Sequence, residues 1–295
     1  MPPSSSAPIS NDEPEVAAAI PTRKVVVQFF VGPLLIVLLC AGIYFLFGVV
    51  VFEKKSPSDF LTQIRSGSSS ERWQAAFELS RWFASAPDAA RDPQFASEIV
   101  RLFEQSTHED PRVRRYLALA LGRLGSSAAV VPLIAALDDS DPETQLYAAW
   151  SLGAIKDRAA IEPLTQRLHA EDAGMVKMAS FALGTIGDPS VAPLLVPLLE
   201  HASAEVRWNS ALALAQLGDA SGRGVLLGMT EPEELARVAG MSDVQKSEAM
   251  SNALIALHRI GDPAGAERIR ALAASAPYSE VRRVAASLLA GQKSS

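Results

Sequence analysis

Apolar residues recur along most of the chain at helical spacing, and the pattern itself repeats every 31 residues. The phrase Leu-Gly-x-Leu/Ile-Gly-Asp, or a close variant of it, begins at Leu121, Leu152, Leu183 and Leu214. A fifth copy begins at Leu257, 43 residues later, which is one period plus twelve. Self-similarity with a period of about 20–50 residues is typical of solenoids, in which each unit buries its apolar face against its neighbours.

Each period contains two amphipathic helices, and no strand pattern appears anywhere. The expected helices span residues 59–65, 72–83, 95–103, 111–124, 128–137, 142–155, 159–168, 174–186, 191–199, 205–217, 222–228, 244–260, 264–273 and 279–289. Glycine follows most second helices and fits a left-handed C-cap, with Lys156 as the exception. We therefore expect an all-α, right-handed α-solenoid of about seven helix pairs, preceded by one transmembrane helix.

One face of the second helices keeps its apolar character in every copy. In the first copy this face holds Val113, Leu117, Leu121 and Leu124, and the same register recurs in the following three copies. A stripe at 3.6-residue spacing is typical of a helix face that packs in the core. A second position stays small, and its residues are Ala118, Ala149, Ser180 and Ala211. We expect these small residues to allow close helix approach.

The opposite face of the second helices does not repeat, so the fold does not dictate its residues. Aromatic, Met and basic side chains on such a face are typical of protein-binding surfaces. The candidate contact residues are Arg115, Tyr116, Tyr147, Lys177, Met178, Trp208 and Asn209. A neighbouring row, Leu119, Trp150, Phe181 and Leu212, fits either this surface or inner-layer packing.

The N-terminal part of the chain has a different character. Residues 1–24 read as a disordered tail and 25–52 as an uncharged apolar run of 28 residues, long enough for a transmembrane helix. Residues 53–58 form a linker, 59–291 the repeat domain and 292–295 a C-terminal tail. More Lys and Arg side chains follow the run than precede it, which favours a cytoplasmic repeat domain. The expected localisation is therefore a single-pass membrane protein.

The repeats resemble the short bacterial HEAT-like repeat. The matching residues are Asp110-Pro111-Arg112-Val113-Arg114 with 118–125, and Glu205-Val206-Arg207 with 211–219. The resemblance implies a curved stack of helix pairs whose second helices line the concave side. Proteins with such repeats include scaffolds, bilin lyase subunits and a diiron hydroxylase, so the resemblance does not specify one function.

The charged and reactive residues narrow the chemistry. The net charge is −6, which argues against a nucleic-acid partner. The single cysteine, Cys40, lies in the apolar run, and His108-Glu109 is the only pair of the type that diiron repeat proteins use several times. Asp138, Asp139 and Asp141 fit either a calcium site or helix caps. We therefore expect no cofactor, no metal and no enzymatic activity.

The leading hypothesis is a membrane-anchored scaffold that binds an unidentified protein partner through its concave face. The alternative is a lyase-type enzyme or an enzyme accessory subunit, and self-assembly stays open. Extra residues at 84–94 and 230–243 interrupt the period and fit either binding loops or neutral surface loops.

Overall fold

A computed structural model describes residues 31–51, 56–85 and 93–291, and these residues form helices and turns with no strand among them. The chain divides into two units, Met1–Lys55 and Ser56–Ser295. The expected tails at 1–24 and 292–295 and residues 53–55 of the expected 53–58 linker lie outside the described residues.

The first unit contains the helix α2 (Gly32–Val51). None of the helices in the described ranges combines the length and apolar character that a bilayer crossing requires. The transmembrane helix over 25–52 and the single-pass membrane localisation, with its cytoplasmic repeat domain, were therefore wrong predictions. Residues 25–30 and 52 of that run lie outside the described residues.

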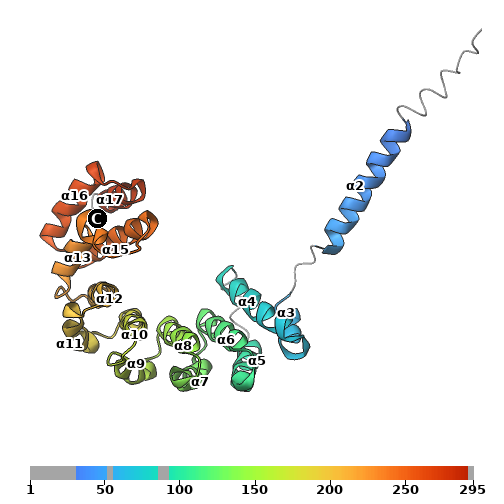
Figure 1. The fold of residues 1–295 in the computed structure, drawn as a ribbon, viewed down its shortest axis with the longest axis horizontal. Coiled ribbons are helices and arrows are strands. Elements are labelled where there is room, and N and C mark those ends of the chain that lie inside the picture. Colours follow the sequence, from blue (N-terminus) through green and yellow to red (C-terminus); the bar gives the residue numbers. More distant parts are fainter. Residues whose placement is uncertain (1–30, 52–55, 86–92, 292–295) are drawn as a thin grey trace, which may run out of the picture. The chain divides into compact units, whose positions relative to one another are not determined.

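The second unit is a succession of helix pairs, and each pair packs on the next (Figure 1). Its α-helices are α3 (Pro57–Ser66), α4 (Ser69–Ser85), α5 (Pro93–Gln105), α6 (Pro111–Leu124), α7 (Val130–Ala135), α8 (Pro142–Ile155), α9 (Ile161–Arg167), α10 (Ala173–Ile186), α11 (Ala192–Leu195), α12 (Ala204–Gln216), α13 (Arg223–Met229), α14 (Pro232–Ala236), α15 (Asp243–Arg259), α16 (Pro263–Ser275) and α17 (Ser279–Gly291). This arrangement confirms the all-α repeat solenoid.

The second helices α4, α6, α8, α10 and α12 pack side by side and line the inner side of the arc, while α5, α7, α9 and α11 lie on its outer side (Figure 1). The inner side of this unit is called the concave face below. It is the side that the resemblance to HEAT-like repeats implied. Because the second helices form one continuous layer, side chains from adjacent repeats lie next to each other on the free face of that layer.

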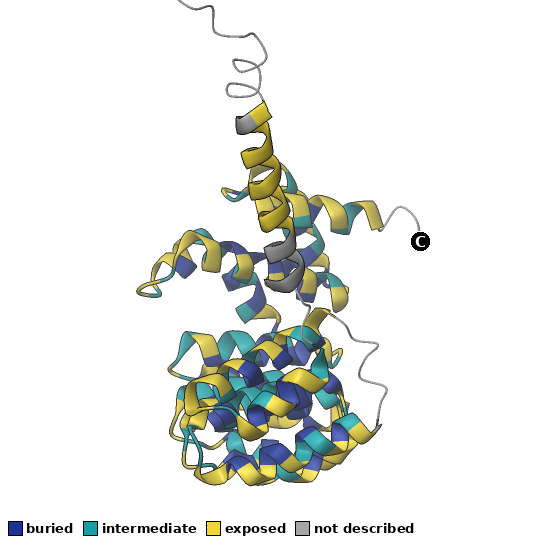
Figure 2. Ribbon diagram, turned by 90° about the vertical axis from the view of Figure 1, so that its right-hand side faces the viewer, coloured by how far each residue is buried: buried dark blue, intermediate teal, exposed yellow. Residues whose placement is uncertain are grey.

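The core follows the repeated stripe of the sequence. Val113, Leu117, Leu121 and Leu124 are buried, and the equivalent positions of the next three repeats are buried except for their last member. Figure 2 shows buried residues on the helix faces that are turned toward other helices. The four small residues at 118, 149, 180 and 211 are fully buried, as the expected close helix approach requires.

Helix ends obey local rules. Gly125, Gly187, Gly218 and Gly261 adopt the left-handed conformation that was expected for them, with φ between 67° and 81°. Lys156 adopts the same conformation, with φ 61°, although a side chain at this φ is strained. The repeat geometry therefore demands a left-handed residue at this position even where the sequence does not supply glycine.

First helices are shorter than their apolar pattern suggests. The expected helix 128–137 is divided into the 3₁₀ turn Ser127–Ala129, α7 and the 3₁₀ turn Ala136–Asp138. The next two first helices also begin with a 3₁₀ turn. Proline stands at the third position of α7 and α9. It is tolerated there because the backbone N–H that proline lacks would have no intrahelical acceptor in the first turn.

The extension at 230–243 carries the short helix α14 and places Leu235 fully buried in a C-terminal core. This core, which includes Met250, Leu254 and Ile269, is separate from the larger core of the preceding repeats. The extension is thus a packed element of the solenoid. Residues 86–92 of the other extension lie outside the described residues.

Candidate functional site

The concave face gathers aromatic side chains from successive second helices. The rings of Tyr116 on α6 and Tyr147 on α8 lie 6.4 Å apart between centroids, at an angle of 50°. Tyr116 also lies 6.4 Å from Trp73 and 5.0 Å from Phe77, both on α4. The aromatic row therefore begins one repeat earlier than the sequence analysis placed it.

A register signal could have revealed Trp73 and Phe77. The extension in the first repeat adds eleven residues, so a position on α4 lies 42 residues, one period plus eleven, before its equivalent on α6. With that offset, Phe77 is equivalent to Leu119 and Trp73 to Arg115. Reading the register only at the exact 31-residue spacing left both residues out.

A hollow of about 670 Å³ opens on this face between α6, α8 and α10, and it is called the α6–α8–α10 hollow. Its lining residues are Leu119, Arg123, Glu143, Leu146, Tyr147, Trp150 and Met178. The lining is thus mainly apolar and aromatic, with one cation and one anion at its edge. Of the predicted contact residues, the hollow brings Tyr147 and Met178 together.

The charged side chains around this hollow already have partners. The guanidinium of Arg115 donates to both carboxylate oxygens of Asp141 at 2.6 Å and to Glu143 at 2.6 Å. Nη1 of Arg123 donates to the Ser80 carbonyl oxygen at 2.6 Å. Because these cations are satisfied within the solenoid, the hollow mainly offers apolar and aromatic surface.

The pairing with Arg115 also changes the acidity of Asp141. Hydrogen bonds from Arg115, and secondarily from Thr144, hold the pKa of this carboxyl at about 2, below its ordinary value of 3.8. Asp141 is also the N-cap of α8, where its side chain accepts from the Thr144 amide. One carboxylate therefore joins the start of one second helix to a side chain of the preceding one.

The remaining predicted contact residues lie further along the face. Lys177 on α10 pairs with Glu205 on α12 at 2.5 Å. Trp208 lines a second hollow of about 450 Å³, together with α13 and the extension that carries α14. Asn209 lines a third hollow, described next. The seven predicted residues are all half-buried. Four of them are divided among three hollows, Tyr147 and Met178 in the first, Trp208 in the second and Asn209 in the third, whereas Arg115, Tyr116 and Lys177 line none of the three.

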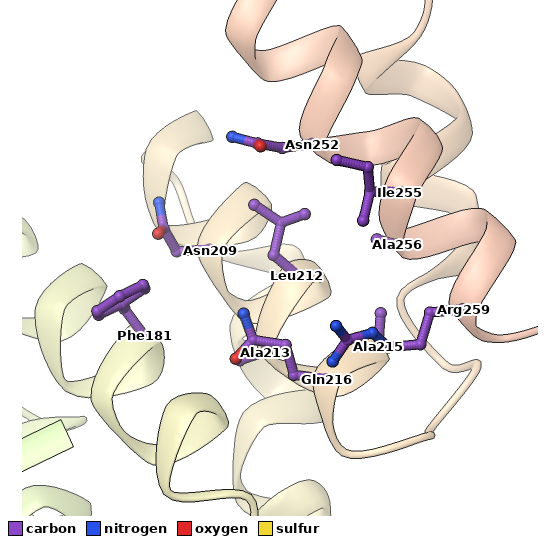
Figure 3. Close-up of a pocket in the computed structure, with 10 residues that line it drawn as sticks. All are labelled: Phe181, Asn209, Leu212, Ala213, Ala215, Gln216, Asn252, Ile255, Ala256 and Arg259. Carbon is purple, nitrogen blue, oxygen red and sulfur yellow. The ribbon is translucent and has the colours of Figure 1, made fainter. Parts of the chain in front are cut away.

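The third hollow has a volume of about 260 Å³ and lies between α10, α12 and α15, and it is called the α10–α12–α15 hollow (Figure 3). Its lining residues are Phe181, Asn209, Leu212, Ala213, Ala215, Gln216, Asn252, Ile255, Ala256 and Arg259. The α15 residues follow the α12 residues at an offset of 43, one period plus twelve, so Asn252, Ile255 and Arg259 are equivalent to Asn209, Leu212 and Gln216. These three residues were not among the predicted contact residues, because their offset of 43 falls outside the regular 31-residue spacing.

The residues that were considered for metal chemistry have other partners. Glu109 forms an ion pair with Arg72. Asp139 pairs with Arg114 and Asp138 with Arg167. Across residues 31–51, 56–85 and 93–291, no group of three or more His, Cys, Asp or Glu side chains is placed to hold a metal ion.

Comparisons with known proteins identify the repeats. Residues 99–182 and 177–242 match the family model for HEAT repeats, so the chain contains HEAT-like repeats. No curated protein matches the sequence.

Several solved structures are similar to this chain, and the first of those described here shares its fold. A chain of the CpcE–CpcF complex of phycocyanin lyase from Nostoc sp. PCC7120 is 22% identical, with a TM-score of 0.57, over 81% of this chain and 95% of that one. A designed armadillo repeat protein is 19% identical, with a TM-score of 0.44, over 80% and 98%. Human deoxyhypusine hydroxylase is 18% identical, with a TM-score of 0.31, over 84% and 99%. At these identities the likeness concerns the fold alone.

Proposed function

We propose that this protein is a HEAT-repeat scaffold that binds a protein partner through its concave face. The observation that carries the proposal is the α6–α8–α10 hollow, where Tyr147, Trp150 and Met178 surround an open space of about 670 Å³. Half-buried aromatic and Met side chains in a concave setting are typical of the residues that dominate binding energy at protein interfaces.

The partner is expected to insert an apolar or aromatic side chain into this hollow. Arg123 and Glu143 at its edge already have partners within the solenoid, so a partner that covers them leaves neither charge buried without a partner. On this proposal the chain makes and breaks no covalent bond. Its contribution is the shape of the face and the fixed spacing of its repeats.

Site-specific photocrosslinking tests this proposal. A photoreactive phenylalanine analogue replaces Trp150 in one variant and Val131 in the matched control, since Val131 lies on α7 and is 76% exposed. We expect the analogue at Trp150 to give discrete crosslinked products in lysate that the analogue at Val131 does not give. The additional change Tyr147→Ala should abolish these products, whereas Tyr278→Ala, at the start of the last helix, should leave them. Identical products from both crosslinker positions would contradict the proposal.

A second candidate is an accessory subunit of a lyase-type enzyme. It rests on the fold shared with the chain of the phycocyanin lyase complex, which has a TM-score of 0.57. This candidate differs from a general scaffold in the ligand that accompanies the protein. A visible absorption band from a bound chromophore in the purified protein would favour it, and a protein partner without such a band would favour the scaffold.

A further inference from the structure

The α10–α12–α15 hollow and the α6–α8–α10 hollow each contain one arginine, and the two arginines differ in whether the side chain has a partner. Arg123 and Arg259 occupy the same position of the repeat when the twelve-residue extension is counted. Arg123 donates to the Ser80 carbonyl oxygen at 2.6 Å. Within the described part of the chain, Arg259 has neither a hydrogen bond nor an ion pair. An Arg that is held at a hollow without an anion is available for one from outside.

The groups near Arg259 can share the recognition of an anion. Figure 3 shows Arg259 reaching from α15 toward α12, with Gln216 on the facing helix and Asn252 further along α15. Gln216 and Asn252 are exposed, and the structure gives neither carboxamide a hydrogen-bond partner among the described residues. The guanidinium of Arg259 and the carboxamide of Gln216 supply N–H donors to one anion, and Asn252, about 10 Å further along α15, supplies a donor to a more distant part of the ligand. An Arg–carboxylate pair is stronger than a neutral hydrogen bond.

Apolar side chains complete the hollow. Phe181, Leu212 and Ile255 line it, and Ile255 is 42% exposed although it is a large apolar residue. A ligand that satisfied Arg259 alone would leave this apolar surface in water. The lining therefore favours a ligand that carries an anionic group beside an apolar one.

The hollow exists because the regular helix spacing ends here. A Cβ at Gly122, Gly153 or Gly184 would lie 2.5–2.8 Å from atoms of the next second helix, so these glycines allow direct contact. In the following repeat the equivalent position is Ala215, whose expected neighbour across the gap is Ala256. Both alanines line the hollow. At this position α12 and α15 contact each other less extensively than the earlier pairs of second helices do, which leaves room for the hollow.

No acidic side chain lines the hollow and cancels the charge of Arg259. Asp262, three residues after Arg259, is already paired with Arg223 at 2.8 Å. Glu248 lies on the same helix as Arg259, but eleven residues before it, about 16 Å along the axis. This separation exceeds the Debye length of about 8 Å at physiological ionic strength, so Glu248 leaves the attraction for an external anion largely intact.

We propose that the α10–α12–α15 hollow binds the carboxylate of an Asp or Glu side chain on a protein partner, with an adjacent apolar residue of the same segment packed on Phe181, Leu212 and Ile255. The volume of about 260 Å³ fits one or two side chains, and it falls below the about 300–1,000 Å³ of pockets that hold a whole organic ligand. This inference rests on the proposed scaffold function and specifies the chemistry of the partner.

A random-peptide display library, selected on the full-length protein, tests the inference. Selected peptides are then synthesised with their acidic residue or with the matching amide, and their affinity is measured by fluorescence polarisation. The protein variants are Arg259→Gln and, as the matched control, Arg270→Gln on α16, because Arg270 is exposed and also has no ion pair in the described chain. Circular dichroism verifies that both variants keep the fold.

We expect the selection to enrich peptides with Asp or Glu beside an apolar residue. Arg259→Gln, or the amide in the peptide, should each weaken binding by about tenfold or more, because a charge-assisted hydrogen bond is lost. The two changes together should weaken binding little further, and Arg270→Gln should have no effect.

Enriched peptides that lack a carboxylate, or that bind Arg259→Gln as tightly as the wild type, would overturn the inference. If such peptides still lose affinity on Tyr147→Ala, the scaffold proposal stands without it. A selection that enriches no peptide also counts against the inference, and the crosslinking contrast between Trp150 and Val131 then decides the scaffold proposal separately.

Discussion

Asp141 shows how a single side chain connects two repeats. It caps α8 through the Thr144 amide at 2.9 Å and accepts two hydrogen bonds from Arg115 on α6. Its side chain is only 13% exposed, so water screens these bonds weakly. The sequence alone left Asp141 open as a calcium ligand or a cap, because a carboxylate in a turn suits both roles equally well. The neighbouring guanidinium resolves the choice in favour of the cap.

The stability of the solenoid should depend on pH through this carboxyl. Folding lowers the pKa of Asp141 from 3.8 to about 2, so the unfolded chain binds the proton more tightly than the folded one. The contribution is therefore complete above about pH 5 and is lost as the pH falls through 2, and its size is about 2 kcal/mol at about 1.36 kcal/mol per pKa unit. Urea unfolding between pH 2 and 7 measures it.

Asp141→Asn should remove this part of the pH dependence and lower the stability at pH 7. Asp188→Asn is the control. Asp188 is also an N-cap, of the turn Pro189–Val191, and it also pairs with an arginine, but that arginine, Arg158, is 81% exposed and its pairing is therefore screened by water. The control should keep the acid-sensitive step that Asp141 produces. If the free energy of unfolding of the wild type and of Asp141→Asn changed in parallel with pH, Asp141 would not be the source of this pH dependence.

Lys156 illustrates a cost that the repeat geometry imposes on one residue. Its φ of 61° is the value that glycine adopts at the equivalent positions of the flanking repeats. The sequence predicted those glycine caps correctly and treated Lys156 as an exception. The structure places Lys156 in the same conformation because the chain must turn there to begin the next helix pair.

Second helices approach each other closely at their glycines. A Cβ at Gly153 on α8 would lie 2.8 Å from the Cα of Ala182 on α10, which is backbone and cannot rotate away. We therefore expect Gly153→Ala to destabilise the protein by about 1–3 kcal/mol through overpacking, although alanine is the better helix former. Thermal and urea unfolding measure the change.

Gly228 provides the matched control for this substitution. It lies within α13, and a Cβ there would meet nothing within 4 Å. Gly228→Ala should leave the stability unchanged or raise it by about 1 kcal/mol, the difference in helix propensity. Equal destabilisation by both substitutions would show that propensity or another effect dominates, and the contact between α8 and α10 would then not be limiting.

The whole solenoid consists of two apolar cores joined near α12 and α15. Leu235 reaches the C-terminal core from the twelve-residue extension and is fully buried there. Solenoids are stabilised by nearest-neighbour contacts, so damage in one unit is felt mainly by adjacent units. The extension therefore stabilises the last helix pairs, and the hollows on either side of the joint depend on it.

Leu235→Ala tests this division into two cores. The substitution should cost about 2–5 kcal/mol, as for other buried leucines, and amide hydrogen exchange should accelerate in α15, α16 and α17. Exchange in α6 and α8 should stay close to that of the wild type. Leu164→Ala, in the larger core, should produce the opposite distribution. Uniform acceleration along the whole unit would mean that the solenoid unfolds as one cooperative body.

The 31-residue period was sufficient to predict the helix pairs, the buried stripe and most helix ends. These features depend on residues within one or two turns of each other and on a pattern that every repeat restates, so a single sequence contains the information. The length and lack of charge of the run at 25–52 predicted a membrane span, but no helix among the described residues is long and apolar enough to cross a membrane.

The tertiary arrangement decided which non-repeating side chains act together. Arg123 and Arg259 occupy equivalent positions, yet one is held by a carbonyl oxygen on α4 and the other faces an open hollow. Ala215 occupies the position on α12 where the earlier second helices have glycine, and α12 contacts α15 less extensively than those helices contact one another. Such differences arise from distances between helices that lie 31 to 43 residues apart in the chain. Pairing and helix spacing depend on packing across that separation, and local sequence patterns do not specify it.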